Sequence, residues 1–152
     1  MAIRTIVKDG DDVLRKISKP VEKFDDKLFQ LLDDLLETVN QVNGVGLAAV
    51  QVGVLRRVAV VLDLENDEVI ELINPEIVEK SGEQREVEGC LSFPGKYGMV
   101  SRAETVKIKT LTRSGSVKFY IGEGLTARAF CHEIDHMDGI VFGDKVDEWV
   151  NI

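Results

Sequence analysis

The chain has few of the residues that could form a covalent scaffold, because it contains only two cysteines and two histidines in 152 residues. Two cysteines without a secretory signal in Met1–Gly10 argue against a disulfide-rich secreted domain, and both thiols are expected to be reduced. No apolar run approaches the length of a membrane span. These absences together predict a cytoplasmic protein without a membrane partner.

The chain also has no excess of positive charge. Asp and Glu number 27 against 19 Lys and Arg, which gives a net charge of -8. A nucleic-acid-binding surface requires a basic field, so direct binding of nucleic acid is not expected. A length of 152 residues with 44% hydrophobic residues suits one globular domain, spanning residues 1–152, with a core of its own.

Both histidines fall in one short stretch, which contains the pattern H-E-x-x-H. On a helix, positions i and i+4 lie on the same face, so His132 and His136 can direct two imidazole nitrogens at one metal ion. Glu133 stands beside them as a candidate base. A pair of surface histidines is the alternative, but the concentration of every histidine in this motif favours a metal site.

Local signals predict that the motif lies on a helix. The run from Leu125 onward contains no helix breaker, and Gly139 follows the last turn, where a left-handed cap favours glycine. Leu125 and Ala129 share a face with the two histidines, whereas the other side is apolar (Phe130, Ile134 and Met137). We therefore expect the histidine face to border a cleft while the apolar side packs on a core.

The remaining pattern predicts an α+β fold, in which antiparallel strands surround the metal-binding helix and a long core helix lies near the N-terminus. A short helix is expected at 11–17, and a long one from the N-cap Asp25 to Gly44. Strands are expected at 58–62, 69–73, 76–80, 83–89, 105–112 and 117–121, the last two forming a hairpin. The glycine-rich stretch 44–51 by itself indicates a tight turn.

A catalytic zinc-type site requires a third protein ligand and one open position. The chain has no third histidine, and only carboxylates follow the motif. Cys131 is adjacent to His132 and therefore points about 100° away around the helix, as expected of a small buried residue. Cys90 lies between a predicted strand and a turn, and the alternative for it is a buried core position. The need for one more ligand favours coordination by Cys90.

Three segments together resemble the peptide deformylase family. The segment at 44–51 is similar to its G-x-G-x-A-A-x-Q motif, 88–92 matches E-G-C-L-S, and 132–136 matches H-E-x-D-H, all in the family's order. The resemblance covers nearly the whole chain. It implies removal of the N-terminal formyl group from nascent polypeptides that begin with formyl-methionine. It also implies one divalent metal ion, natively Fe2+, with Zn2+, Ni2+ or Co2+ able to occupy the site.

The resemblance also implies roles for individual residues. Three residues would bind the metal and leave a fourth position for water, namely Cys90, His132 and His136. Glu133 would take the proton of the water and later deliver it to the leaving amine. The oxyanion would be stabilised by the metal, the side-chain amide of Gln51 and the backbone N–H of Leu91.

Substrate binding is expected along a glycine-rich edge, where an extended peptide could pair as an added strand. The methionine side chain would enter an apolar pocket, and the candidate substrate-binding residues are Val45, Gly46, Gly89, Leu125 and Ala129. Arg128, one turn before His132, is expected to line this pocket with its stem while its charge reaches the rim.

Groups around the metal ligands can be predicted as well. Metal-bound histidines usually donate their second N–H to an acceptor, and the nearest candidates by sequence are Glu88 and Asp135. Arg102 could neutralise either carboxylate, with an ordinary surface charge as the alternative.

Two other functions fit the ligand pattern. One is a zinc endopeptidase of the H-E-x-x-H type, and the other is a non-catalytic Cys/His metal-binding module. Many bacterial deformylases continue into a long basic C-terminal helix that helps them dock at the ribosome, whereas this sequence ends at Ile152. A transient ribosome association is therefore expected without a defined mode. Cys131 stands where the family frequently has Gln.

Overall fold

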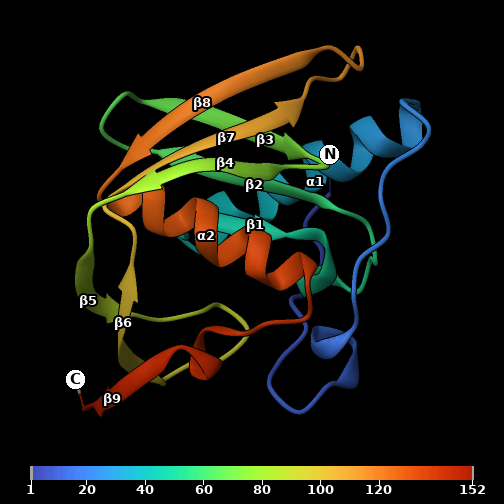
Figure 1. Cartoon of the computed structure of the whole chain (residues 1–152). Helices are drawn as coiled ribbons and strands as arrows, with labels where there is room; N and C mark the ends of the chain where they lie inside the picture. Colours follow the sequence, from blue (N-terminus) through green and yellow to red (C-terminus); the bar gives the residue numbers. More distant parts are fainter. Residues whose placement is uncertain (1, 152) are drawn as a thin grey trace.

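A computed structural model describes residues 2–151, and within that range nine strands form three antiparallel sheets around two α-helices (Figure 1). The helices are α1 (Asp26–Gln41) and α2 (Leu125–Met137). One sheet has the order β1 (Gly46–Ala48), β2 (Val58–Asp63), β3 (Glu68–Ile73). The second is β4 (Glu76–Ser81), β7 (Thr105–Leu111), β8 (Val117–Glu123), and the third is β5 (Gln84–Glu88), β6 (Tyr97–Arg102), β9 (Val146–Val150). The predicted α+β class with antiparallel strands is confirmed.

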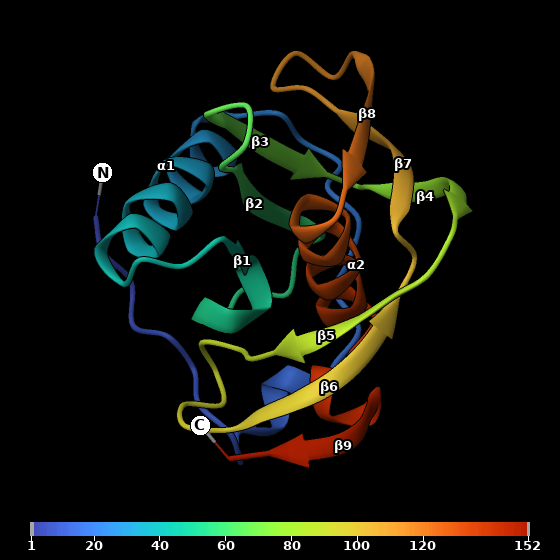
Figure 2. The same ribbon diagram turned by 90° about the vertical axis from the view of Figure 1, so that its left-hand side faces the viewer.

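The β1–β2–β3 sheet lies between the two helices, as Figure 2 shows. Successive side chains of a strand point to opposite faces. Accordingly, Val58 and Val60 belong to the apolar cluster against α1, whereas Ala59 and Val61 belong to the cluster against α2. Because both faces of β2 are covered, its sequence is a continuous apolar run rather than an alternation.

Helix α1 is the predicted core helix. Asp25 caps it by accepting a hydrogen bond from the backbone N–H of Leu28 at 3.1 Å. Its buried apolar side chains lie at helical spacing and pack against the first sheet (Leu28, Leu31, Leu32, Leu35 and Val39). The helix ends at Gln41, a few residues before the predicted end at Gly44.

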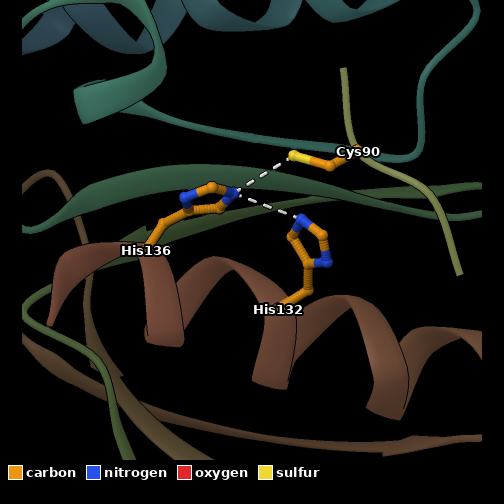
Figure 3. A group of neighbouring side chains, drawn as sticks. All are labelled: Cys90, His132 and His136. Atoms are coloured by element: carbon orange, nitrogen blue, oxygen red, sulfur yellow. Dashed lines mark hydrogen bonds between the residues drawn. The ribbon is translucent and has the colours of Figure 1, made fainter. Parts of the chain in front are cut away.

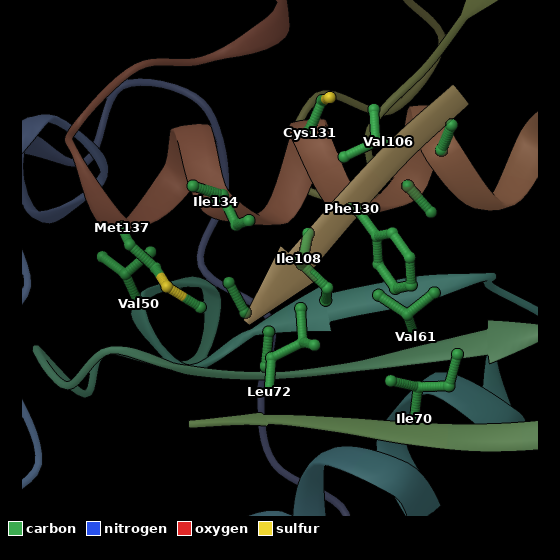
Figure 4. Close-up of a cluster of buried hydrophobic side chains, with 14 residues drawn as sticks. Val50, Val61, Ile70, Leu72, Val106, Ile108, Phe130, Cys131, Ile134 and Met137 are labelled. Atoms are coloured by element: carbon green, nitrogen blue, oxygen red, sulfur yellow. The ribbon is translucent and has the colours of Figure 1, made fainter. Parts of the chain in front are cut away.

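Helix α2 crosses the middle of the molecule and carries the histidine motif (Figure 1). Phe130, Ile134 and Met137 pack into the apolar cluster that also receives side chains from β2, β3 and β7 (Figure 4). Gly139 has φ +74, and a Cβ there would lie 2.5 Å from the carbonyl oxygen of Arg15. Glycine is therefore required just after the helix, as predicted. Within residues 2–151, neither helix is long and apolar enough to cross a membrane.

Two predictions about local structure are wrong. Residues 44–51 contain the short strand β1, paired with β2, followed by the 3-10 helix η2 (Ala49–Val52), rather than a simple turn. Three residues are too few for a periodic pattern, so only the pairing with β2 defines this strand. The helix expected at 11–17 is a single 3-10 turn, η1 (Asp12–Arg15), because Asp11 caps the backbone N–H of Val13 at 3.0 Å and the chain extends again at Lys16.

The strands β6 and β9 were not predicted. Within the described residues, strand β9 pairs only with β6, at the edge of a sheet, and its middle residues are exposed. Two acidic residues at its centre, Asp147 and Glu148, are held by Arg85 of β5. An edge strand with a polar, exposed centre has no alternating apolar pattern, so its sequence carries little strand signal. Between α2 and β9 lies a further 3-10 turn, η3 (Phe142–Asp144).

Candidate metal centre

Three potential metal ligands converge from two distant parts of the chain. Cys90 follows β5, and His132 and His136 project from one face of α2. The Cys90 Sγ lies 3.4 Å from His136 Nε2, which lies 3.2 Å from His132 Nε2 (Figure 3). All three ligand atoms lie within 4.8 Å of one another.

The distances of 3.4 and 3.2 Å fit a single ion. Ligand atoms held about 2.0–2.3 Å from a tetrahedral zinc-type ion lie roughly 3.3–3.6 Å from each other. The three residues supply one soft sulfur and two imidazole nitrogens, a set that suits zinc and also accepts iron, nickel or cobalt. His136 is buried, and its Nδ1 has no hydrogen-bond partner among the described residues. The site therefore has the donor atoms and the spacing for a divalent ion.

Glu88 orients the His132 ring. Its Oε1 lies 2.6 Å from His132 Nδ1, which leaves Nε2 to face Cys90 and His136. This predicted contact is confirmed. The other predicted acceptor is wrong, because Asp135 contacts Arg102 Nη1 at 2.6 Å rather than a histidine. Arg102 also donates to Glu88 at 2.7 Å and is buried, so it neutralises both carboxylates and is not a surface charge.

The charges around the histidines favour a cation. Burial raises the pKa of Glu88, but His132 and Arg102 outweigh burial and hold that pKa below its usual range. Burial likewise opposes protonation of His132, yet Glu133, Cys90 and Glu88 raise its pKa well above the usual range. Burial and the neighbouring His132 lower the pKa of His136. The acidic groups beside His132 thus favour positive charge at this position.

Glu133, like His136, has a buried polar atom without a hydrogen-bond partner among the described residues. Its side chain is buried, and its Oε1 accepts no hydrogen bond from the described residues. Burial raises the pKa of Glu133 to about 7, against an opposing effect of His132. The backbone of Gly46 lies against it, since a Cβ at Gly46 would meet Glu133 Oε2 at 2.7 Å. A buried carboxyl group with this pKa can exchange a proton near neutral pH.

Gln51 is held by hydrogen bonds on both sides of its amide. Its Oε1 accepts from the backbone N–H of Ala48 at 3.0 Å, and its Nε2 donates to Ser92 Oγ at 3.2 Å. The same Nε2 lies 3.6 Å from Cys90 Sγ. The amide donor is therefore aimed at the metal centre. Ser92 had no predicted role, although its position inside the E-G-C-L-S segment was a signal.

The N-terminal segment also contacts the site, which the sequence did not indicate. The backbone N–H of Val7 donates to Gln51 O, and that of Asp9 donates to Ser92 O, both at 2.7 Å. Lys8 Nζ donates to Leu91 O at 3.3 Å. Three consecutive residues thus join η2 to the segment after Cys90.

A cavity of about 540 Å³ opens beside the ligands. All five predicted substrate-binding residues line it, and so do the predicted catalytic residues (Val45, Gly46, Gly89, Leu125, Ala129; Gln51, Leu91, Glu133). Cys90 and His132 also face the cavity, whereas His136 is buried at 1% exposure. The structure therefore brings together every site residue that the sequence singled out.

The prediction that Arg128 lines the cavity is confirmed, but the predicted position of its charge is wrong. Its side chain lines the cavity, but its guanidinium is buried rather than at the rim, and it donates to Glu88 Oε2 and to the backbone carbonyl of Val100. The attraction of the buried Glu88 carboxylate explains this inward position. Cys131 is a buried residue of the α2 cluster, as predicted, and both cysteines are free thiols.

The fold and the site together indicate a metal-dependent hydrolase whose candidate ligands are Cys90, His132 and His136, with Glu133 next to them. The chain belongs to the polypeptide deformylase family, whose model matches residues 3–151. Enzymes of this family remove the formyl group from nascent peptides in a metal-dependent reaction, and this is the activity of the chain.

Individual relatives agree along nearly the full chain. A peptide deformylase from Acetivibrio thermocellus is 54% identical over 151 residues, which cover 99% of this chain and 88% of the relative. The crystal structure of a peptide deformylase from Legionella pneumophila has a TM-score of 0.91 at 49% identity, covering 96% of this chain and 87% of the other. A Met-Ala-Ser-bound structure of the class I type b enzyme from Acinetobacter baumannii has a TM-score of 0.89 at 36% identity, covering 95% and 99%. These matches do not support an endopeptidase or a non-catalytic metal-binding module.

Proposed function

We propose that residues 1–152 form a single catalytic domain in which Cys90, His132 and His136 hold one divalent ion on the central helix α2. The convergence of the three ligand atoms within 4.8 Å is the observation that carries this proposal. From the family resemblance we propose Fe2+ as the native ion, with Zn2+, Ni2+ and Co2+ able to replace it, because this ligand set accepts all four metals.

The residues around the site divide the chemistry between them. A bound divalent ion would supply a Lewis acid that polarises the formyl carbonyl and lowers the pKa of water. Glu133 takes a proton from the attacking water and returns it to the leaving amine, which its pKa of about 7 allows near neutral pH. Nε2 of Gln51 and the backbone N–H of Leu91 donate hydrogen bonds to the oxyanion.

The substrate binds in the cavity as an added strand. Strands β1 and β5 are each the last strand of their sheet, so each has an unpaired edge, and residues of both line the cavity. An extended peptide can pair with such an edge while its side chain enters the adjoining pocket. Leu125 and Ala129 form the apolar wall for the methionine side chain, and Val45, Gly46 and Gly89 provide backbone groups. The structure of the Acinetobacter baumannii enzyme with Met-Ala-Ser bound supports the proposal that the cavity binds a short peptide.

The partners follow from the activity. The substrates are the N-termini of nascent polypeptides, and we propose that the enzyme works in the cytoplasm and associates transiently with the ribosome. The net charge of -8 disfavours direct binding to nucleic acid.

Formate release tests the proposal. Formyl-Met-Ala-Ser is incubated with protein that was purified and loaded with Fe2+ without oxygen, because a thiolate-ligated site is sensitive to oxidation. We expect stoichiometric formate and Met-Ala-Ser. Unblocked Met-Ala-Ser serves as the control and should remain intact. Cleavage of the control peptide, or no formate from a metal-loaded sample, would refute the assignment.

A further inference from the structure

Arg128 and Arg102 bind the same buried carboxylate from different elements. Nη1 of Arg128, on α2, donates to Glu88 Oε2 at 2.5 Å. Arg102, on β6, donates to both oxygens of Glu88, from Nη2 to Oε1 at 2.7 Å and from Nε to Oε2 at 3.2 Å. The side chains of all three residues are 5% exposed.

The two arginines differ in their remaining contacts. Arg102 also pairs with Asp135, so its charge is shared between two carboxylates. Arg128 instead uses Nη2 for neutral acceptors, the backbone carbonyl of Val100 at 3.0 Å and Gln84 Oε1 at 3.3 Å. Two positive and two negative charges therefore balance within the cluster, and Glu88 is the only carboxylate that Arg128 contacts in the described chain.

Glu88 depends on such contacts for its orientation. It is the last residue of β5, an edge strand whose three preceding residues are exposed. Glu88 itself is buried and pairs with Gly98 of β6, which fixes its backbone, so the orientation of its carboxylate depends on its hydrogen bonds. The same carboxylate accepts from His132 Nδ1 at 2.6 Å, so a rotation of Glu88 would move the ring. Outer contacts of this kind orient the ring of a metal-bound histidine and raise its basicity.

We propose that Arg128 is a positioning residue of the metal centre. From the cavity side it fixes the Glu88 carboxylate, and through Glu88 it holds Nε2 of His132 toward the other two ligands. The inference rests on the proposed metal site and adds a residue to which the motif patterns assign no part. It also explains why a charged side chain occupies a cavity wall beside Ala129 and Leu125: the guanidinium is turned toward the protein, and only the stem serves the wall.

The test measures metal affinity in three variants by competition with a chelator, using Zn2+ as the probe. Arg128→Met keeps the apolar stem but removes every donor, and we expect it to lose about 10–100-fold in affinity, the usual effect of removing such a supporting contact. Arg128→Lys restores one charged donor and should recover part of the loss. The control is Gln84→Met, which removes one Arg128 contact and the hydrogen bonds of Gln84 to the carbonyls of Ala103 and Gly124, but leaves the contact with Glu88. It should bind Zn2+ as the wild type does.

Two further readouts separate positioning from general stability. The metal-free proteins are compared by thermal unfolding, and formate release by the loaded proteins is resolved into kcat and KM. In Arg128→Met we expect kcat to decrease while KM changes little. The methionine stem preserves the cavity wall, so substrate binding should be kept.

Wild-type affinity in Arg128→Met would overturn the inference while leaving the proposed function intact. So would a loss in Arg128→Lys as large as that in Arg128→Met, or an equal loss in Gln84→Met. If the wild type itself bound no Zn2+, the proposed metal site would fail instead. Should Arg128→Met not fold, the comparison of Arg128→Lys with Gln84→Met decides the question, since only the former changes the contact with Glu88.

Discussion

The helices α1 and α2 each bury a carboxylate, and the two carboxylates differ in their hydrogen-bond partners and in the direction of their pKa shifts. Asp34 on α1 accepts hydrogen bonds from the backbone N–H of Ala2, from Arg4 Nε and from Gln30 Nε2, at 2.8, 2.8 and 2.6 Å. Burial raises the pKa of Asp34, but these donors outweigh burial and lower it below the usual range. On α2, Glu133 Oε1 has no partner in the described chain, and burial raises the pKa to about 7.

The difference separates a carboxylate that stabilises the fold from one that is available for the proposed proton transfer. A buried polar group normally has its partners, because an unpaired one costs folding free energy. At Asp34 on α1 that rule holds, and the carboxylate anchors the N-terminal segment through Ala2 and Arg4. At Glu133 on α2 the rule is broken beside the candidate metal ligands, where the proposed reaction requires a group that is free to exchange a proton.

The largest expected effect comes from removing the reactive carboxylate. Glu133→Gln keeps the size of the side chain but cannot accept a proton, so we expect kcat for formate release to fall by about 10²–10⁴-fold. Bound metal, measured by elemental analysis, should be unchanged. Near-normal turnover with full metal content would show that Glu133 is not the base.

A smaller catalytic loss is expected at the oxyanion donor. Gln51→Ala should lower kcat by about 10²–10³-fold, equivalent to about 2.7–4 kcal/mol of barrier. Metal should again stay bound, and Gln51→Glu, which keeps the length but removes the donor, should be similarly impaired. Retained activity in Gln51→Ala would remove this residue from the mechanism.

A substitution in the apolar core around α1 should affect stability alone. Leu35 is fully buried, so Leu35→Ala should lower the free energy of unfolding by about 3 kcal/mol. The kcat per folded molecule should match the wild type, and the exposed Asn40→Ala is the control for both measurements. A lower kcat in the folded Leu35→Ala protein would contradict the conclusion that α1 contributes only to stability.

The smallest effect is expected at the satisfied carboxylate, and it depends on pH. Because the pKa of Asp34 is lowered in the folded chain, its contribution is full above the unfolded value of about 3.9 and disappears as the pH falls through the folded value. Asp34→Asn should cost about 1.5 kcal/mol at pH 7 and less at pH 3, measured by urea unfolding. An equal difference at both pH values would mean that the charge of Asp34 contributes nothing.

The sequence predicted the parts of the molecule that have strong local patterns. The leucine spacing of α1, the apolar run of β2 and the alternation of β7 gave these elements close to their observed limits. The motifs predicted residues that lie together in the structure, because H-E-x-x-H places two candidate ligands on one helix face and E-G-C-L-S contributes the sulfur.

The missed features depend on contacts between distant segments. β9 is a strand only because it pairs with β6, and the Val7 and Asp9 amides join the site through backbone groups, which no side-chain pattern encodes. The position of the Arg128 charge was predicted wrongly for the same reason. Long charged side chains usually reach solvent. Here the buried Glu88 carboxylate, which is distant in sequence, attracts the guanidinium inward.

The account depends on Cys90 as the third ligand, and metal stoichiometry tests this most directly. Protein purified without oxygen should hold about one divalent ion per chain, and Cys90→Ala should hold far less. Cys131→Ala is the matched control, because that thiol lies on α2 next to His132 but outside the ligand group, and it should retain the ion. A Cys90→Ala protein that keeps its ion with wild-type affinity, or a Cys131→Ala protein that loses it, would contradict the account.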